Sequence, residues 1–91
     1  MKKVETETTS KISSVEIKGN VIDKSSKETL AGAIVYVDGN KVYTNLEGEF
    51  KLNNLSPGKH TIKAELISYE TSQMEVDLEE NSNITIPLLQ K

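Results

Sequence analysis

The stretch Leu30–Gly39 reads L-A-G-A-I-V-Y-V-D-G, and the stretch Thr44–His60 reads T-N-L-E-G-E-F-K-L-N-N-L-S-P-G-K-H. In both stretches, short runs of alternating apolar and polar residues are separated by residues that favour turns. The glycines at these turns are Gly32, Gly39, Gly48 and Gly58. This spacing predicts several short antiparallel strands joined by tight turns, and therefore a small all-β domain.

Alternation outside this stretch extends the strand pattern to most of the chain. We expect seven strands, at residues 15–22, 33–38, 41–44, 49–52, 59–66, 71–78 and 83–88. One side of each strand is mostly apolar, and no window of helical period exceeds a turn or so. The pattern predicts a seven-stranded antiparallel Greek-key β-sandwich, whose two sheets pack face to face.

Individual residues refine this expectation. Gly19 lies inside the first strand, where a glycine indicates a bulge or a close backbone approach. Leu30 is the lone apolar residue of a polar connection, and we expect it to close one end of the sandwich. Residues 53–58 are interpreted as a turn-forming loop with Leu55 buried. Pro87 cannot donate a ladder hydrogen bond, so the last strand should lie at an edge or end there.

Composition bounds the class of protein. The chain has 91 residues, no cysteine and a formal net charge of −3, with lysines and acids interspersed. The length allows one domain, and the absence of a basic stripe argues against nucleic acid as a partner. No apolar run approaches the ~20 residues of a membrane helix, so we expect no direct membrane insertion. Residues 1–13 are polar and predict a flexible tail or linker, followed by a domain at 14–91.

The first residues, Met-Lys-Lys, are similar to the charged start of a signal peptide. The following residues 4–14 are polar and offer no hydrophobic segment, so we expect no signal peptide in this stretch. A cytoplasmic protein and an excised domain of a secreted protein both fit this pattern, and we favour the second.

The order of several short motifs resembles the carboxypeptidase regulatory-like domain, a transthyretin-like (prealbumin-like) sandwich. The resemblance runs over about residues 15–88. It is carried by I-K-G-N-V-I-D at 17–23, L-A-G-A-I-V-Y-V at 30–37, T-N-L-E-G-E-F-K-L-N-N-L at 44–55, P-G-K-H-T-I at 57–62 and S-Y at 68–69. The motif positions that we expect to serve the fold are Gly19, Val21, Asp23, Leu30, Gly32, Ala33, Gly39, Thr44, Gly48, Phe50, Leu55, Gly58 and Tyr69.

Three positions depart from the family pattern. Asn45 stands where the family usually has Asp, His60 where it has Tyr, and Ser68 where it has Gly. Asn45 can still cap a turn through its side chain. If the Asp of the family holds a cation, that role is in doubt here.

The resemblance implies a non-catalytic accessory module with no cofactor. Such modules follow metallocarboxypeptidase domains and occur in envelope proteins of Bacteroidetes-type bacteria, including the N-terminus of TonB-dependent outer-membrane receptors. We therefore expect a monomer in the bacterial periplasm or cell envelope that presents loops and edge strands to a protein partner or a neighbouring domain.

Candidate catalytic and metal-binding residues are few. His60 is the only histidine, and a hydrolytic zinc site needs about three protein ligands. We interpret His60 as an inward or boundary strand residue. The acids Glu75, Asp77, Glu79 and Glu80 are interpreted as a solvated strand face and end. We therefore expect no catalytic residue, no metal site and no enzymatic activity, with a transthyretin-like hydrolase as the alternative from the enzyme class.

Ile34, Tyr36 and Tyr43 are the best candidates for an exposed interaction surface, because tyrosines are common binding anchors. The same residues also fit a sheet edge or end. Two further alternatives are a carbohydrate- or small-ligand-binding sandwich and a structural stalk or adhesin repeat. The related Cna-B-type sandwiches form Lys–Asn isopeptide bonds beside a buried acid. Here Ala64 occupies the position of that acid and Glu65 lies one residue away, so we expect no such bond.

Overall fold

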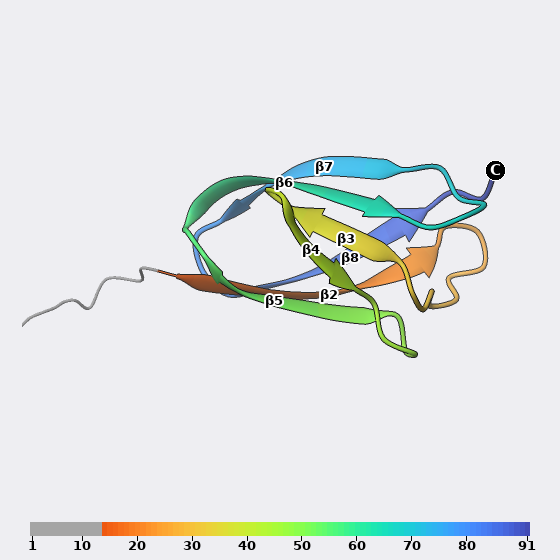
Figure 1. The fold of residues 1–91 in the computed structure, drawn as a ribbon, viewed down its shortest axis with the longest axis horizontal. Coiled ribbons are helices and arrows are strands. Elements are labelled where there is room, and N and C mark those ends of the chain that lie inside the picture. The colour runs from red at the N-terminus through yellow and green to blue at the C-terminus, as the bar shows by residue number, and fades with distance from the viewer. Residues whose placement is uncertain (1–13) are drawn as a thin grey trace, which may run out of the picture.

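The computed structural model describes residues 14–91, which form a sandwich of two β-sheets (Figure 1). The predicted polar tail, residues 1–13, lies outside the described residues. The strands are β2 (Val15–Asp23), β3 (Ile34–Val37), β4 (Asn40–Tyr43), β5 (Glu49–Leu55), β6 (Gly58–Glu65), β7 (Ser72–Leu78) and β8 (Ser82–Leu88). The all-β sandwich predicted from the sequence is confirmed, with one strand at each expected place.

The strands divide into a three-stranded sheet of order β5-β2-β8 and a four-stranded sheet of order β4-β3-β6-β7. Every ladder is antiparallel except that between β2 and β8, which is parallel and runs from the pair Ile17–Ser82 to the pair Asp23–Leu88. The expectation of antiparallel strands is therefore wrong for this pair. Because β8 is the last strand of its sheet, the predicted edge position of Pro87 is correct.

The core lies between the sheets and is built from the inward side of each strand, as the alternation predicts. Its fully covered side chains include Ile17, Val35, Ile62, Leu78 and Ile86. Leu30 packs against this core from the connection between β2 and β3, as expected for a residue that closes one end of the sandwich.

Gly19 is a site of close backbone approach. A Cβ atom at this position would lie 2.3 Å from the carbonyl oxygen of Ile84 and 2.8 Å from Cζ of Phe50. Gly19 pairs with Phe50 on one side and Ile84 on the other, so the aromatic ring fills the space left by the missing side chain. The register shift of the β2–β5 ladder lies instead between Val15 and Ile17.

One predicted boundary is wrong by several residues. Residues 53–58 were expected to form a loop, whereas β5 continues to Leu55 and β6 begins at Gly58. Leu55 is buried as expected and pairs with Val15 beyond the register shift. Asn54 has a φ of 62°, so the strand bends at a residue type that tolerates this conformation.

Candidate functional site

An aromatic face lies on the outer side of β3 and β4. Ile34 and Tyr43 are cross-strand partners, and Tyr36 follows Ile34 on the same side of β3. Tyr43 is 55% exposed, while Ile34 and Tyr36 are half-buried. The structure thus brings together the three residues that the sequence singled out. We call Ile34, Tyr36 and Tyr43 the aromatic face.

Lysines lie over both tyrosine rings. The Nζ atom of Lys63 is 5.0 Å from the ring centre of Tyr36, and that of Lys41 is 5.7 Å from the ring centre of Tyr43. Lys63 also pairs with Glu65 at 3.4 Å. Cation–π contacts at exposed sites contribute about 0.5–1 kcal/mol. They favour the observed ring positions, and the face is a surface of aromatic rings bordered by charge.

The aromatic face continues into a hollow at the end of the sheet. The hollow has a volume of about 460 Å³ and is lined by Ile34, Leu66, Ile67 and Tyr69 among others. Ile67 is 89% exposed. The sequence pattern did not single out Ile67, because an isolated apolar residue in a turn carries no periodic signal.

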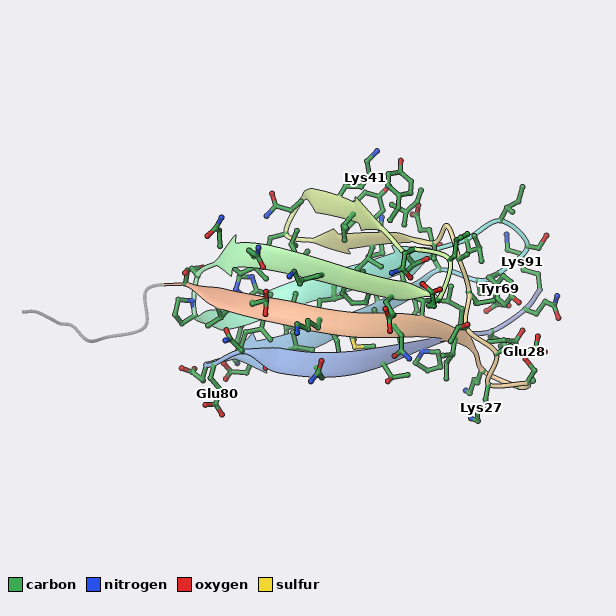
Figure 2. All side chains as sticks on the ribbon, turned by 90° about the horizontal axis from the view of Figure 1, so that it is seen from below. Lys27, Glu28, Lys41, Tyr69, Glu80 and Lys91 are labelled. Carbon is green, nitrogen blue, oxygen red and sulfur yellow. The ribbon has the colours of Figure 1, made fainter. Side chains whose placement is uncertain are left out.

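A second, open hollow of about 750 Å³ lies against β2, β5 and β8. Most of its lining is polar, and Tyr43 contributes an aromatic ring. Thr85 donates a hydrogen bond to Asn20 Oδ1 at 2.9 Å. Figure 2 shows the sheet that bears this polar lining facing the viewer. The lining consists of Lys18, Gly19, Asn20, Tyr43, Asn45, Glu49, Phe50, Lys51, Asn83, Ile84 and Thr85.

His60 is buried and bound on both sides. Its Nδ1 atom contacts a carboxylate oxygen of Asp38, and its Nε2 atom contacts the carbonyl oxygen of Ser56. Both partners are acceptors, so both ring nitrogens must carry hydrogen. The Ser56 carbonyl, and then Asp38, raise the pKa of His60, while burial opposes them. The hydrogen bond from His60 lowers the pKa of Asp38.

The contacts of His60 connect two turns of the sandwich. Asp38 and Gly39 form the two-residue turn between β3 and β4, with φ of 51° and 89°. His60 therefore ties this turn to the corner between β5 and β6. The prediction of an inward strand residue is correct, and its ring nitrogens are already engaged. Among residues 14–91, no group of three or more histidine or acidic side chains is arranged to hold a metal ion.

Asp23 and Tyr69 meet at the opposite end of the sandwich. Tyr69 donates a hydrogen bond to Asp23 Oδ2 at 2.8 Å, and the amides of Ser25 and Ser26 donate to Oδ1 at 2.8 and 2.9 Å. The Ser26 amide, followed by Tyr69, lowers the pKa of Asp23, and the bond to Asp23 raises the pKa of Tyr69. Tyr69, Glu28 and Lys91 gather at this end, far from Glu80 (Figure 2).

The remaining motif residues lie at buried, hydrogen-bonded or turn positions. Thr44 is buried, donates to the carbonyl of Leu30 at 2.7 Å and accepts from the amide of Ala33 at 2.8 Å. Asn45 caps its turn as expected, accepting from the amides of Glu47 and Glu49. Among the other motif positions, Val21, Ala33, Phe50 and Leu55 are buried, and Gly32, Gly39, Gly48 and Gly58 have positive φ.

The position that Cna-B-type sandwiches give to a buried acid is apolar here. Ala64 is fully buried in the core. Glu65 lies on the outer side, where it pairs with Lys63 and its carboxylate is 3.5 Å from the Tyr36 hydroxyl. The side chain next to Ala64 therefore lies on the wrong side of the sheet to assist an isopeptide bond in the core.

Strand order and packing define the chain as a prealbumin-like β-sandwich. A family model described as the CarboxypepD_reg-like domain matches residues 17–91, and the chain belongs to this family. The resemblance inferred from the motifs is thereby confirmed. No match is found among curated proteins. Residues 14–91 contain no helix of the length and apolarity needed to cross a membrane.

Several solved structures share the fold at low sequence identity. The group B streptococcus pilus 2b backbone protein has a TM-score of 0.73 and 16% identity, over 84% of this chain and 41% of that one. A cohesin–X-dockerin complex from Acetivibrio cellulolyticus has a TM-score of 0.67 and 20% identity, with coverages of 82% and 56%. A protein from Bacteroides uniformis, provisionally described as carbohydrate-binding, has a TM-score of 0.66 and 13% identity, with coverages of 84% and 41%. The chain spans less than two thirds of each of these structures.

Proposed function

We propose that this domain is a non-catalytic interaction module of a bacterial cell-envelope protein, which presents a sheet face, loops and edge strands to a protein partner or a neighbouring domain. The aromatic face carries this proposal. Its three apolar side chains lie side by side on an outer sheet surface, with two lysines at the rings. Tyrosine side chains supply large contact areas at low entropic cost, and they are frequent anchors of protein interfaces.

Two further observations support a non-catalytic role in the envelope. Both ring nitrogens of His60 are bound by Asp38 and Ser56, so the one histidine is not free to act as a general base. The solved structures of similar fold include a pilus backbone protein and a cohesin–X-dockerin complex. A pilus and a cohesin–dockerin complex are both protein assemblies, which supports the proposal that this chain is a monomer that attaches to another protein outside the cytoplasm.

Photocrosslinking in the intact parent protein tests the proposal. A benzophenone amino acid at Tyr43 should form a covalent adduct with one polypeptide, to be identified by mass spectrometry. The same amino acid at Glu80, which is exposed after β7 and lines neither hollow, serves as the control. The substitution Tyr36→Ser should reduce the adduct at Tyr43. An absence of adduct at Tyr43, or the same adducts at both positions, contradicts the proposal.

The open hollow against β2, β5 and β8 favours carbohydrate binding as a second candidate function. Its lining combines amide side chains of Asn20, Asn45 and Asn83 with the ring of Tyr43. Sugars are bound by polar side chains next to aromatic rings. Titration with oligosaccharides should then shift the NMR signals of Asn83 and Tyr43, whereas shifts spread over the whole surface or none at all contradict this function.

A structural stalk or adhesin repeat is the third candidate. The chain enters the sandwich at the start of β2 and leaves after β8, at opposite ends of the molecule (Figure 1). Such a domain fits a serial array. Forced unfolding of single molecules, with tension applied at the two ends of the domain, tests this candidate.

A further inference from the structure

Strand β7 is an edge strand of the four-stranded sheet (Figure 1). It pairs with β6 without a register shift, from Gly58–Leu78 to Ala64–Ser72. Within residues 14–91, no strand pairs with its other side. Edge strands are commonly protected by proline, by a bulge, by an inward-pointing charge or by charged side chains along the edge. Strand β7, whose sequence is S-Q-M-E-V-D-L, has no proline, bulge or inward-pointing charge, and its charged side chains are the outward acids Glu75 and Asp77.

The hydrogen bonds of β6 identify which amides of β7 face outward. The amide of Asp38 donates to the carbonyl of Thr61 at 3.3 Å, and the amide of Thr61 donates to Asp38 Oδ1 at 3.2 Å. The backbone groups of Thr61 therefore point away from β7. Glu75 lies opposite Thr61, so the N–H and C=O of Glu75 point to the free edge of the sheet. By alternation, the same holds for Gln73 and Asp77.

The side chains of β7 give this free edge a polar, acidic face and an apolar face. Gln73, Glu75 and Asp77 are exposed on the outer face, while Met74 and Val76 point toward the core and remain half-buried. Within residues 14–91, neither Glu75 nor Asp77 forms an ion pair. A hydrogen bond with Asp77, together with the negative charge of that residue, raises the pKa of Glu79, so two acids are crowded at this end of β7. A strand added here would cover apolar groups on one face and meet carboxylates on the other.

We propose that the free edge of β7 binds an extended segment of another protein, in which lysine or arginine alternates with small apolar residues. The segment adds a strand to the four-stranded sheet. It hydrogen-bonds to Gln73, Glu75 and Asp77, places its basic side chains beside Glu75 and Asp77, and places its apolar side chains over Met74 and Val76. Such β-augmentation combines backbone affinity with side-chain specificity. The inference rests on the proposed function, and it names the partner chemistry at one edge.

The other edge strands of the two sheets are less suited to binding an added strand. Strand β4 has four residues, β5 bends at Asn54, and β8 contains Pro87. A second copy of β7 would bring two rows of carboxylates together, and like charges on neighbouring strands are destabilising. The acidic row therefore favours a basic partner over self-association.

Binding of a designed peptide tests the inference. The probe is a fluorescent peptide of about nine residues, near the upper end of the usual strand lengths, in which lysine alternates with valine or threonine. The control peptide has glutamate in place of lysine. We expect the basic peptide alone to bind, with NMR shifts concentrated at residues 73–77 and with weaker binding at high salt. Equal binding of both peptides, or no binding of the basic one, overturns the inference.

Two sets of variants separate the backbone from the charge contribution. Gln73→Pro removes an outward amide without altering charge or the ladder to β6, and it should weaken binding roughly tenfold, corresponding to the loss of about one hydrogen bond. Glu75→Lys with Asp77→Lys should weaken binding at least as much. Glu28→Lys with Glu47→Lys changes net charge equally at exposed sites elsewhere, and it should leave binding nearly unchanged.

The remaining outcomes are also decisive. If Gln73→Pro does not fold, N-methylation of alternate peptide amides replaces it, and only one of the two methylation registers should retain binding. If the shifts fall at Tyr36 and Tyr43, or if ultracentrifugation shows a dimer that Glu75→Lys with Asp77→Lys abolishes, the β7 inference is wrong. The module function itself is judged by the separate crosslinking at Tyr43.

Discussion

Gly19 is a residue at which one added methyl group has a large expected effect. Its Cβ would meet the carbonyl oxygen of Ile84 at 2.3 Å, and a backbone atom of a paired strand cannot move aside cheaply. Gly19→Ala should lower the free energy of unfolding by about 3 kcal/mol, the upper part of the range for overpacking. Urea denaturation measures the difference.

Two variants control this prediction. Lys18→Ala, at the neighbouring exposed position of β2, should change stability by at most about 0.5 kcal/mol. Phe50→Leu in the Gly19→Ala background relieves the contact with the ring but not that with Ile84, so rescue should be incomplete. Full rescue would show that the backbone contact is not the cause.

Ser68 occupies the position where the family pattern has glycine, and its φ is 73°. A residue other than glycine in the left-handed region destabilises the folded state by about 1–2 kcal/mol. Replacement by glycine removes this cost, but the greater conformational freedom of glycine in the unfolded chain offsets part of the gain. Ser68→Gly should therefore stabilise the domain by about 0.5–1 kcal/mol in thermal or urea unfolding. Thr71→Gly, at a residue without positive φ, should destabilise it. A destabilising effect of Ser68→Gly would contradict the argument.

His60 should make stability depend on pH. Its folded pKa lies above its ordinary value of 6.5. The contribution of His60 to the free energy of unfolding is therefore complete below pH 6.5, and it is lost as the pH rises through the folded pKa. His60→Gln should lose that pH dependence. It should also be less stable at low pH by about 1–3 kcal/mol, because Asp38 and Ser56 lose a donor. NMR titration of the imidazole and urea denaturation across pH check both parts.

Asp38→Asn is the matched control for His60. Asn-Gly suits the same two-residue turn, so the turn remains while the carboxylate is removed. The pKa of His60 should fall but stay above that of a buried histidine without acceptors, because Ser56 still binds it. Asp38 itself, with a lowered pKa, loses its contribution as the pH falls below 3.8 through its folded value. A wild-type protein whose stability does not fall above pH 6.5 contradicts the charged state of His60.

At the scale of elements, the hydrogen bonds of Asp23 join the end of β2 to the segment before β7. The bond from Tyr69 helps to keep the pKa of Asp23 low, so the stabilising effect of Asp23 is present above pH 3.8 and is lost as the pH falls through its folded value. Tyr69→Phe should raise the pKa of Asp23 and move acid unfolding to higher pH. Carboxyl NMR titration measures the shift, and Tyr43→Phe, on an exposed ring, should leave it unchanged.

The alternation of apolar residues was enough to predict the strands, but not how they pair. Parallel and antiparallel strands share the same two-residue period, so nothing local indicates that β2 and β8 run in the same direction. The sequence does not indicate the end of β5 because Asn53 and Asn54 are poor strand formers. Leu52 and Leu55, on either side of them, pair with Ile17 and Val15 of β2, and this pairing continues the strand across the register shift. Tertiary contacts decided both cases.

The candidate site was predictable to a similar degree. Parity alone places Ile34 and Tyr36 on one side of β3, and the Asp38-Gly39 turn fixes the register that brings Tyr43 opposite Ile34. The contact between Asp23 and Tyr69 and the one between His60 and Asp38 join residues distant in sequence. No sequence period reports such contacts, so they became visible only in the folded molecule.

At the scale of the whole molecule, the parallel pairing of the first and last described strands sets how the domain carries force. The β2–β8 ladder extends from Ile17–Ser82 to Asp23–Leu88. Tension applied at residue 14 and at Lys91 pulls these strands in opposite directions along their length, so the ladder bonds are loaded together. Tension applied at residue 14 and at Glu80 acts at the same end of both strands, so the bonds open one after another.

Single-molecule force spectroscopy distinguishes the two geometries. The chain has no cysteine, so Ser14→Cys with Lys91→Cys and Ser14→Cys with Glu80→Cys provide unique handles. Forced unfolding reports the unfolding rate rather than the equilibrium stability, so both variants should show equal stability in urea but a higher unfolding force for the first pair. Equal forces would mean that the terminal ladder does not bear the load, and the stalk function would lose its structural support.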